Sequence, residues 1–165
     1  MALLKAAAFS VALGLGFFST QPGYAGACVE DIGETVTLAA NGATYDSGRI
    51  IEYIAHIAPR DLYNSKGVRL RDVGAILQQD RANLHKTGVA DGSGDFSDRF
   101  EDYFTTLKRR QLLSAAPRFY YCGLSKAGIA RFEQGILNAQ LPGLVWVAGF
   151  RLPDGTFALA LSQVD

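Results

Sequence analysis

The sequence is poor in the residues that most often carry chemistry. It has two cysteines, two histidines and one tryptophan in 165 residues, and its formal net charge is zero. The two histidines, His56 and His85, belong to no Cys-x-x-Cys or His-x-x-x-His pattern, so they do not form a recognisable zinc site. Balanced charge argues against the basic stripe that nucleic acid or an anionic membrane requires. We therefore expect no nucleic-acid partner.

Motifs of the common enzyme classes are also missing. The chain has no Gly-x-Ser-x-Gly segment and no phosphate-binding glycine loop with a following lysine. Cys122 precedes Gly123, a position where a nucleophile could lie, but a disulfide at this cysteine would remove the thiol. No catalytic residue and no cofactor is predicted, and the sequence favours a non-enzymatic role.

Residues 1–27 are typical of a cleavable secretory signal peptide. One lysine precedes an apolar run at 6–18, which at about 13 residues is too short to span a bilayer. Small residues follow, and cleavage is expected after either Ala25 or Ala27. The alternative is a buried apolar helix at the N-terminus. The mature chain, residues 28–165, is then expected to be a single globular domain, periplasmic or secreted, with no transmembrane span.

Both cysteines, Cys28 and Cys122, lie in the mature chain and are expected to form a disulfide, because an exported protein meets an oxidising compartment. In the chain-entropy model, a bridge that closes so long a loop is worth about 4–5 kcal/mol. The alternatives are two unpaired thiols or a lipid attached to Cys28. Lipidation is disfavoured because Ala25 stands where lipoprotein signals usually carry a large aliphatic residue.

Hydrophobic spacing predicts three to four helices in the mature chain. The expected helical segments are 47–58, 69–87, 98–113 and 125–137. The first of these is rich in isoleucine, so a strand is the alternative there. Gly88 would end the second helix, Asp95 or Ser97 would cap the third, and Ser125 would cap the fourth.

Strands are expected toward both ends of the mature chain. The expected strand segments are 34–38, 43–45, 118–122, 144–152 and 156–161. Asn41-Gly42 is a hairpin signal between the first two, and Pro153-Asp-Gly155 supplies the tight turn of a C-terminal β-hairpin. The predicted fold class is α+β, with three to four helices packed on a small antiparallel sheet.

One loop has the spacing of a calcium site. Asp91, Ser93, Asp95 and Asp102 place oxygen atoms across a glycine-containing loop, a pattern found in EF-hand loops. However, Phe96 takes the position where the sharp turn requires glycine, and the last aspartate has a shorter arm than glutamate. A flexible loop that ends in a helix cap explains the same residues, so we expect no metal.

Aromatic residues gather in the C-terminal strands. Alternation along a strand would direct some of them to the open face of the sheet, where tyrosine and tryptophan can anchor a partner protein. The candidate binding residues are Tyr120, Tyr121, Trp146 and Phe150. The alternative is that these residues pack in the core under the helices.

These observations favour an exported, non-catalytic domain that binds another protein, as an inhibitor, immunity factor or assembly subunit does. One alternative is a small extracytoplasmic hydrolase that uses paired carboxylates, for which Glu52, Glu101 and Glu133 are available. The other is a protein that binds a small ligand or a metal. A concave pocket holding Glu or His would favour the enzyme, and an exposed aromatic patch would favour the protein-binding domain.

Overall fold

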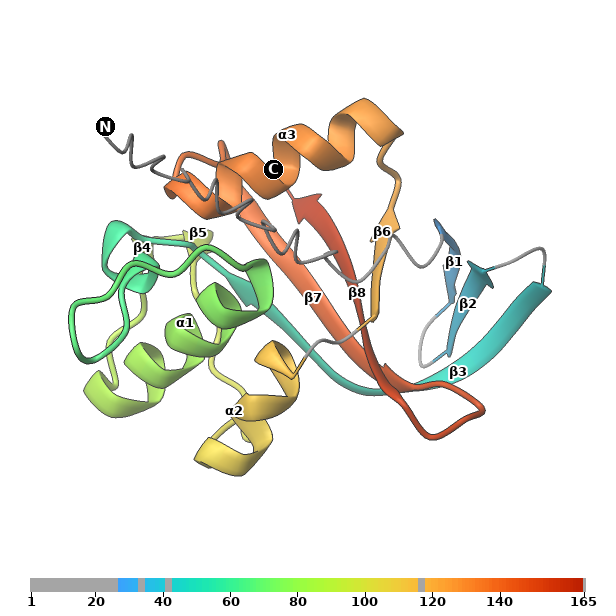
Figure 1. The fold of residues 1–165 in the computed structure, drawn as a ribbon, viewed down its shortest axis with the longest axis horizontal. Helices are drawn as coiled ribbons and strands as arrows, with labels where there is room; N and C mark the ends of the chain where they lie inside the picture. Colours follow the sequence, from blue (N-terminus) through green and yellow to red (C-terminus); the bar gives the residue numbers. More distant parts are fainter. Residues whose placement is uncertain (1–26, 33–34, 41–42, 116–117, 165) are drawn as a thin grey trace, which may run out of the picture.

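The computed structural model describes residues 27–32, 35–40, 43–115 and 118–164, and it has an α+β fold (Figure 1). The elements are β1 (Ala27–Ile32), β2 (Thr35–Ala40), β3 (Ala43–Ala55), the 3-10 helix η1 (Pro59–Leu62), α1 (Val73–Thr87), β4 (Gly92–Ser93), β5 (Phe96–Ser97), α2 (Leu107–Ser114), β6 (Arg118–Cys122), α3 (Lys126–Asn138), β7 (Leu144–Arg151) and β8 (Phe157–Val164). The predicted signal peptide, apart from Ala27, and the Asn41-Gly42 turn lie outside the described residues. In the part of the chain that is described, no helix is both long and apolar enough to cross a membrane.

The main sheet is mixed and closes on itself. Its strand order is β1-β2-β3-β7-β8-β6, and β6 pairs with β1 to complete the ring. All neighbours are antiparallel except β6, which is parallel to both β8 and β1. The prediction of a purely antiparallel sheet is therefore wrong at β6. Helix α3 connects the end of β6 to the start of β7. Strand β8 pairs antiparallel with β7 and parallel with β6, so β6 and β8 run in the same direction.

The isoleucine-rich segment 47–58 is not a helix, because most of it belongs to the long strand β3. Six residues of β3 pair antiparallel with β7, and Tyr53 lies opposite Val147. The β-branched side chains suit a pleated surface, and the ladder to β7 satisfies backbone groups that a helix would otherwise satisfy. The strand alternative is the correct one here.

Two predicted helices form, with the expected C-terminal end of α1 at Gly88 and the expected cap of α3 at Ser125, while α1 begins at Val73 rather than at about Arg69. Asp72 caps α1 by accepting a hydrogen bond from the backbone N–H of Ala75, and Gly88 ends it with a left-handed φ of 66°. Ser125 caps α3 by accepting from the N–H of Gly128 at 3.1 Å. These are local signals, which explains why they could be read from the sequence.

The helix predicted over 98–113 forms only in its second half, as α2, and its cap is Thr106 rather than Asp95 or Ser97. Ahead of α2, the carboxylate of Glu101 accepts hydrogen bonds from the backbone N–H groups of Tyr103 and Phe104. Arginine side chains of α2 donate to backbone carbonyls of the same stretch. Side chains thus satisfy the backbone polar groups that a helix would have paired.

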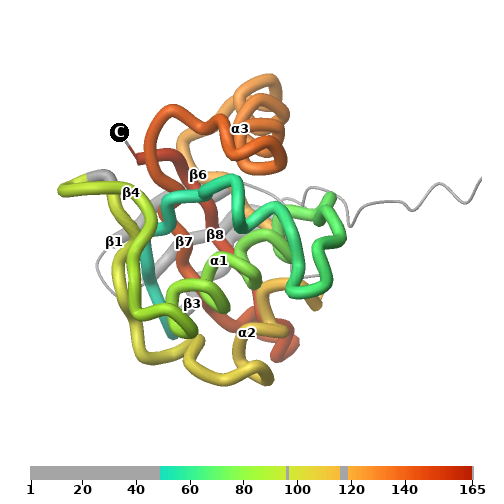
Figure 2. The backbone as a smooth tube through the Cα atoms, turned by 90° about the vertical axis from the view of Figure 1, so that its left-hand side faces the viewer, coloured from blue at the N-terminus to red at the C-terminus, as the bar shows by residue number. Residues whose placement is uncertain are grey.

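Both faces of β6, β7 and β8 are buried. One face shares the larger core with side chains of α1, α2 and α3, which Figures 1 and 2 show packed around the sheet. The other face carries a second buried cluster. Its members are Tyr120, Ala148, Phe150, Leu152, Ala158 and Ala160. Because the sheet closes, neither face of these strands is left open.

Candidate functional site

The aromatic residues predicted to bind a partner are not an exposed patch. Tyr120, Tyr121 and Phe150 are 1%, 3% and 0% exposed, so the expectation of an outward aromatic face is wrong for them. Trp146 is half-buried, and its indole N–H donates to a carboxylate oxygen of Glu52 at 2.7 Å. The alternation of side chains is as expected, but closure of the sheet buries both faces. The core alternative is therefore correct for Tyr121, which packs with the helices, whereas Tyr120 and Phe150 are buried in the cluster on the other face of the sheet.

The calcium-loop residues do not come together. The carboxylate of Asp91 pairs with Arg60 at 2.8 Å, and Ser93, Asp95 and Asp102 are exposed. The short strands β4 and β5 pair across this loop instead of wrapping it around an ion. Nowhere in the described ranges do three or more His, Cys, Asp or Glu side chains gather in a way that could hold a metal.

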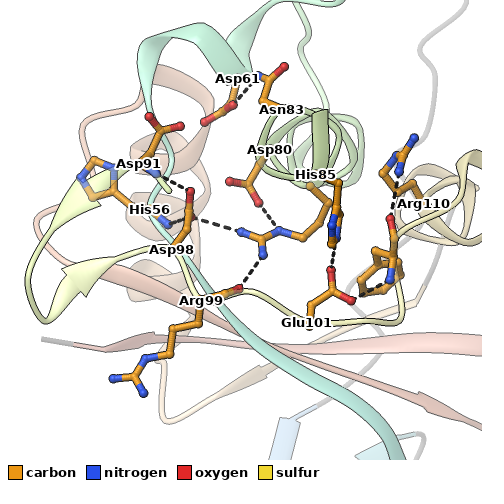
Figure 3. Close-up of polar contacts among 12 residues, drawn as sticks. His56, Asp61, Asp80, Asn83, His85, Asp91, Asp98, Arg99, Glu101 and Arg110 are labelled. Atoms are coloured by element: carbon orange, nitrogen blue, oxygen red, sulfur yellow. Dashed lines mark hydrogen bonds and ion pairs between the residues drawn. The ribbon is translucent and has the colours of Figure 1, made fainter. Parts of the chain in front are cut away.

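The most unusual polar feature is a buried network around Arg81, hereafter the Arg81 network (Figure 3). The guanidinium is 0% exposed, and its Nε donates to Asp80 at 2.7 Å. One Nη donates to Asp98 at 3.2 Å, and the other donates to the backbone carbonyl of Arg99 at 2.9 Å. The same guanidinium lies 4.4 Å from the ring centroid of Tyr53. One side chain thus joins α1, β3 and the segment after β5.

Asp98 extends the Arg81 network to the end of β3. One of its oxygens accepts from the backbone N–H of His56 at 2.6 Å, and the other accepts from the N–H of Asp91 at 2.8 Å. Backbone bonds between Asp98 and Asp91 and between Arg99 and Ile54 follow the same path. The loop that contains β4 and β5 is therefore tied to the core at its base.

Two further carboxylates, those of Asp61 and Glu101, contact residues of α1 near the Arg81 network. Asp61 of η1 accepts from the backbone N–H of Ala58 at 2.9 Å and from the side-chain amide of Asn83 at 2.7 Å. Glu101 lies 2.7 Å from the imidazole of His85 on α1. These contacts fasten η1 and the segment before α2 to the C-terminal half of α1.

Burial disfavours the charged form of two of the interior carboxyls, Asp80 and Asp61. It raises the pKa of Asp80 well above its usual range; Arg81 opposes the rise and Asp98 adds to it. Burial likewise raises the pKa of Asp61, against hydrogen bonds from Asn83 and Ala58. One oxygen of Asp80 and the hydroxyl of Tyr53 are buried without a hydrogen-bond partner. Among the described residues, the interior holds three carboxyl groups, from Asp61, Asp80 and Asp98, and one guanidinium, from Arg81.

The Arg81 network is closed to substrate. The side chains of Arg81, Asp80 and Asp98 are 0%, 0% and 1% exposed. A general acid or base must come within hydrogen-bond reach of the reacting group, and these side chains are enclosed by protein. Their contacts position loops and helices, so the Arg81 network is structural.

An open hollow lies on the outer side of α3. It has a volume of about 430 Å³ and is lined by Ala130, Arg131, Gln134, Gly135, Asn138 and Gln140. The helical members are spaced three or four residues apart, which places them on one face of the helix. Ile129, Phe132 and Ile136 lie on the opposite, buried face. The segment is therefore an amphipathic helix whose polar face lines the hollow.

The C-terminal end of the hollow depends on a tight reversal of the chain. Ala139 has a left-handed φ of 50°, and the N–H of Gln140 donates to the carbonyl of Gly135 at 2.9 Å. A Cβ on Gly135 would lie 2.8 Å from the Cδ1 of Leu141 and 3.3 Å from its Cα. Glycine at this position therefore lets the chain fold back against α3.

The loop between η1 and α1 forms a rim beside the hollow. Arg69 donates from one Nη to the carbonyl of Leu137 at 3.0 Å and to the side-chain oxygen of Asn138 at 3.4 Å. Its guanidinium lies 5.7 Å from the ring centroid of Tyr63. Tyr63 and Val68 are 42% and 58% exposed. The contact of Arg69 with Leu137 of α3 spans 68 residues and carries no local signal.

The chain matches no protein-family model, no curated protein and no solved structure. Its function has to follow from its own residues. Of the two features described above, the α3 hollow with its rim is open to solvent, whereas the Arg81 network is enclosed.

Replacing Arg81 with Met should destabilise the protein strongly. The change leaves buried carboxylates without their cation, which typically costs about 3–5 kcal/mol. Arg60→Met is the matched control, because it removes the partly exposed pair with Asp91 and should cost no more than about 1 kcal/mol. Denaturant unfolding measures both values. Equal losses in the two variants would show that the Arg81 network does not support the fold.

The contribution of Asp61 and Asp80 to the free energy of unfolding should increase on mild acidification. Their pKa values are raised in the folded state, so the folded protein binds protons before the unfolded chain does. Their contribution is then largest below the unfolded pKa of about 3.9 and is lost as pH rises through the folded pKa. Each carboxyl changes the free energy of unfolding by at most about 1.4 kcal/mol per pH unit.

Asp80→Asn should flatten this pH dependence between neutral pH and about pH 4, and denaturant titrations at several pH values measure the slope. Asp102→Asn is the matched control, since Asp102 is exposed. An unchanged slope in Asp80→Asn would contradict the assignment.

Proposed function

We propose that this protein is an exported, non-catalytic domain that binds another protein through the α3 hollow and the rim formed by the η1–α1 loop. The observation that carries the proposal is the chemistry of the lining. It supplies one guanidinium and three carboxamides, from Arg131, Gln134, Asn138 and Gln140. These groups can bind a ligand by hydrogen bonds and charge, but none of them is a general base or a nucleophile.

The rim has the residue types that anchor protein interfaces. Tyrosine and arginine are enriched among the residues that contribute most to binding energy. Tyr63 and Arg69 stand together here, and Val68 adds an exposed apolar side chain next to them. The volume of the hollow falls within the range of ligand sites. An inhibitor, an immunity factor or an assembly subunit would use such a surface.

The three glutamates considered for the hydrolase alternative each contact another side chain and do not pair with one another. Glu52 forms an ion pair with Arg49 at 2.5 Å and accepts from Trp146. Glu101 contacts His85, and Glu133 of α3 accepts from the hydroxyl of Tyr121. Each of these three carboxylates therefore contacts a different side chain in a different region of the fold. This separation supports the non-catalytic proposal.

Export and periplasmic or extracellular location are part of the same proposal. The apolar run at 6–18 and the small residues after it support a signal peptide. Strand β1 begins at Ala27. Cleavage after Ala25 would leave this strand complete, whereas cleavage after Ala27 would remove its first residue. We therefore favour cleavage after Ala25.

A disulfide between Cys28 and Cys122 is also proposed. The backbone register of β1 and β6 places the two residues opposite each other in neighbouring parallel strands. Strands pair about 4.8 Å apart, which is within the Cα separation that disulfides adopt. The bridge would fasten β6 to β1, the pairing that closes the sheet.

Reduction should therefore destabilise the mature protein by about 2–5 kcal/mol. Thermal unfolding with and without reductant, together with thiol labelling of the denatured, unreduced protein, measures the effect. The Cys28→Ser/Cys122→Ser double variant is the control, because reductant should not change its midpoint. Labelling of both cysteines in the unreduced protein would contradict the proposal.

The binding face can be tested by filling the hollow. Ala130 is exposed on α3 and lines the hollow, so Ala130→Trp should block it without touching the core. Crosslinked affinity capture from the native envelope or medium should yield one stoichiometric partner with the wild-type chain. We expect recovery to fall at least about tenfold in the variant, equivalent to about 1.4 kcal/mol.

Ala127→Trp is the matched control, since Ala127 is exposed on the same helix but does not line the hollow. It should capture the partner as the wild type does. Equal capture by both tryptophan variants would rule out the α3 hollow as the binding face.

A further inference from the structure

We infer that the segment bound at the α3 hollow is an acidic stretch of the partner protein, with carboxylates that reach Arg131 and Arg69. This inference rests on the proposed function and adds the chemistry of the partner. It follows from the distribution of charge around the hollow, from the way Arg69 is held, and from the carboxamides of the lining.

Positive charge gathers at this face although the whole chain is neutral. Residues 63–72, which connect η1 to α1, contain Lys66, Arg69 and Arg71. Their one acidic residue, Asp72, accepts a hydrogen bond from the backbone N–H of Ala75 as the cap of α1. Helix α3 contributes Arg131, which lines the hollow. An approaching carboxylate therefore meets an excess of cations here.

The acidic side chain that α3 does carry is already engaged. Glu133 accepts a hydrogen bond from the hydroxyl of Tyr121 in the core. No carboxylate is among the residues that line the hollow. The cations of this face are therefore not neutralised from within the lining.

Arg69 is held in place before any partner binds. Its hydrogen bonds run to the carbonyl of Leu137, the side-chain oxygen of Asn138 and the hydroxyl of Tyr63, all of which are uncharged acceptors. Within the ranges described, Arg69 has no ion pair with a carboxylate. A fixed, exposed guanidinium loses little conformational entropy when it pairs with a carboxylate.

Arg131 supplies the second cation, and it lies inside the hollow itself. It is exposed, and the described part of the chain offers it no ion-pair partner. Asn138 connects the two arginines in space, because it lines the hollow with Arg131 and accepts a hydrogen bond from Arg69. Two carboxylates of one bound segment could therefore be paired at neighbouring points.

The lining favours a peptide over an anionic glycan or a membrane surface. Gln134, Asn138 and Gln140 present amide groups that both donate and accept, as the peptide groups of a bound segment require. A hollow of about 430 Å³ fits a short segment with a few side chains rather than a whole domain.

A labelled hexaglutamate peptide is the direct probe, measured by fluorescence anisotropy at low and at physiological ionic strength. The wild-type mature chain should bind hexaglutamate, and hexaglutamine and hexalysine should not bind. Arg131→Glu should weaken binding at least about tenfold, and Arg131→Lys should restore part of it. Lys126→Glu is the matched control, because it makes the same change of charge on α3 outside the hollow.

An equal loss in Lys126→Glu and Arg131→Glu would overturn the inference, because it would show a response to general charge rather than to the hollow. Binding of a sulfated glycan or of phosphatidylglycerol vesicles without binding of hexaglutamate would overturn it as well. Absence of hexaglutamate binding to the wild-type chain would have the same consequence.

The partner-capture assay separates this inference from the proposed function. If Ala130→Trp loses the partner and Arg131→Glu retains it, the hollow binds a protein but the segment is not acidic. If neither variant loses the partner, both conclusions fail. Loss in both variants, with retention in Ala127→Trp and Lys126→Glu, supports both conclusions.

Discussion

The buried guanidinium of Arg81 is the contact on which most of the helical part of the structure depends. It lies where α1, β3 and the segment after β5 meet, and it balances Asp80 and Asp98 while it stacks on Tyr53. A buried ion pair is weak support for stability by itself, since desolvation offsets much of the attraction. Here, however, the same residues also satisfy backbone groups of three separate segments. Losing the Arg81 cation would weaken all of these contacts at once, because the remaining ones are made by its partner Asp98.

The order imposed by the Arg81 network reaches the surface through η1. Asn83 of α1 donates to Asp61, and Asp61 in turn accepts from the backbone of Ala58 at the start of η1. The loop that follows η1 carries Tyr63 and Arg69 to the C-terminal end of α3. The contacts of the interior thus hold η1 in place, and η1 in turn positions the rim of the α3 hollow. This division explains why the most strongly perturbed carboxyls lie away from the proposed binding face.

The two candidate sites differ in how far the sequence could reveal them. The sequence correctly placed the aromatic strands near the C-terminus. Whether their side chains face solvent or the core depends on whether the sheet closes. That closure requires β6 to lie beside both β1 and β8. The α3 hollow had a partial signal in the spacing of the polar residues Arg131, Gln134 and Asn138. Its rim had none, because Arg69 meets α3 only in the folded chain.

The sequence by itself determined the features that depend on neighbouring residues: the end of α1 at Gly88, the cap of α3 at Ser125, the strand at 118–122, and the α+β composition. Capping side chains and a left-handed glycine act within one helical turn, so their effect is written locally. Tertiary structure decided that 47–58 belongs largely to a strand, that the segment before α2 is not helical, and that both faces of the C-terminal strands are buried. Each of these outcomes depends on hydrogen-bond or packing partners far away in the chain, and side-chain periodicity alone carries no information about such partners.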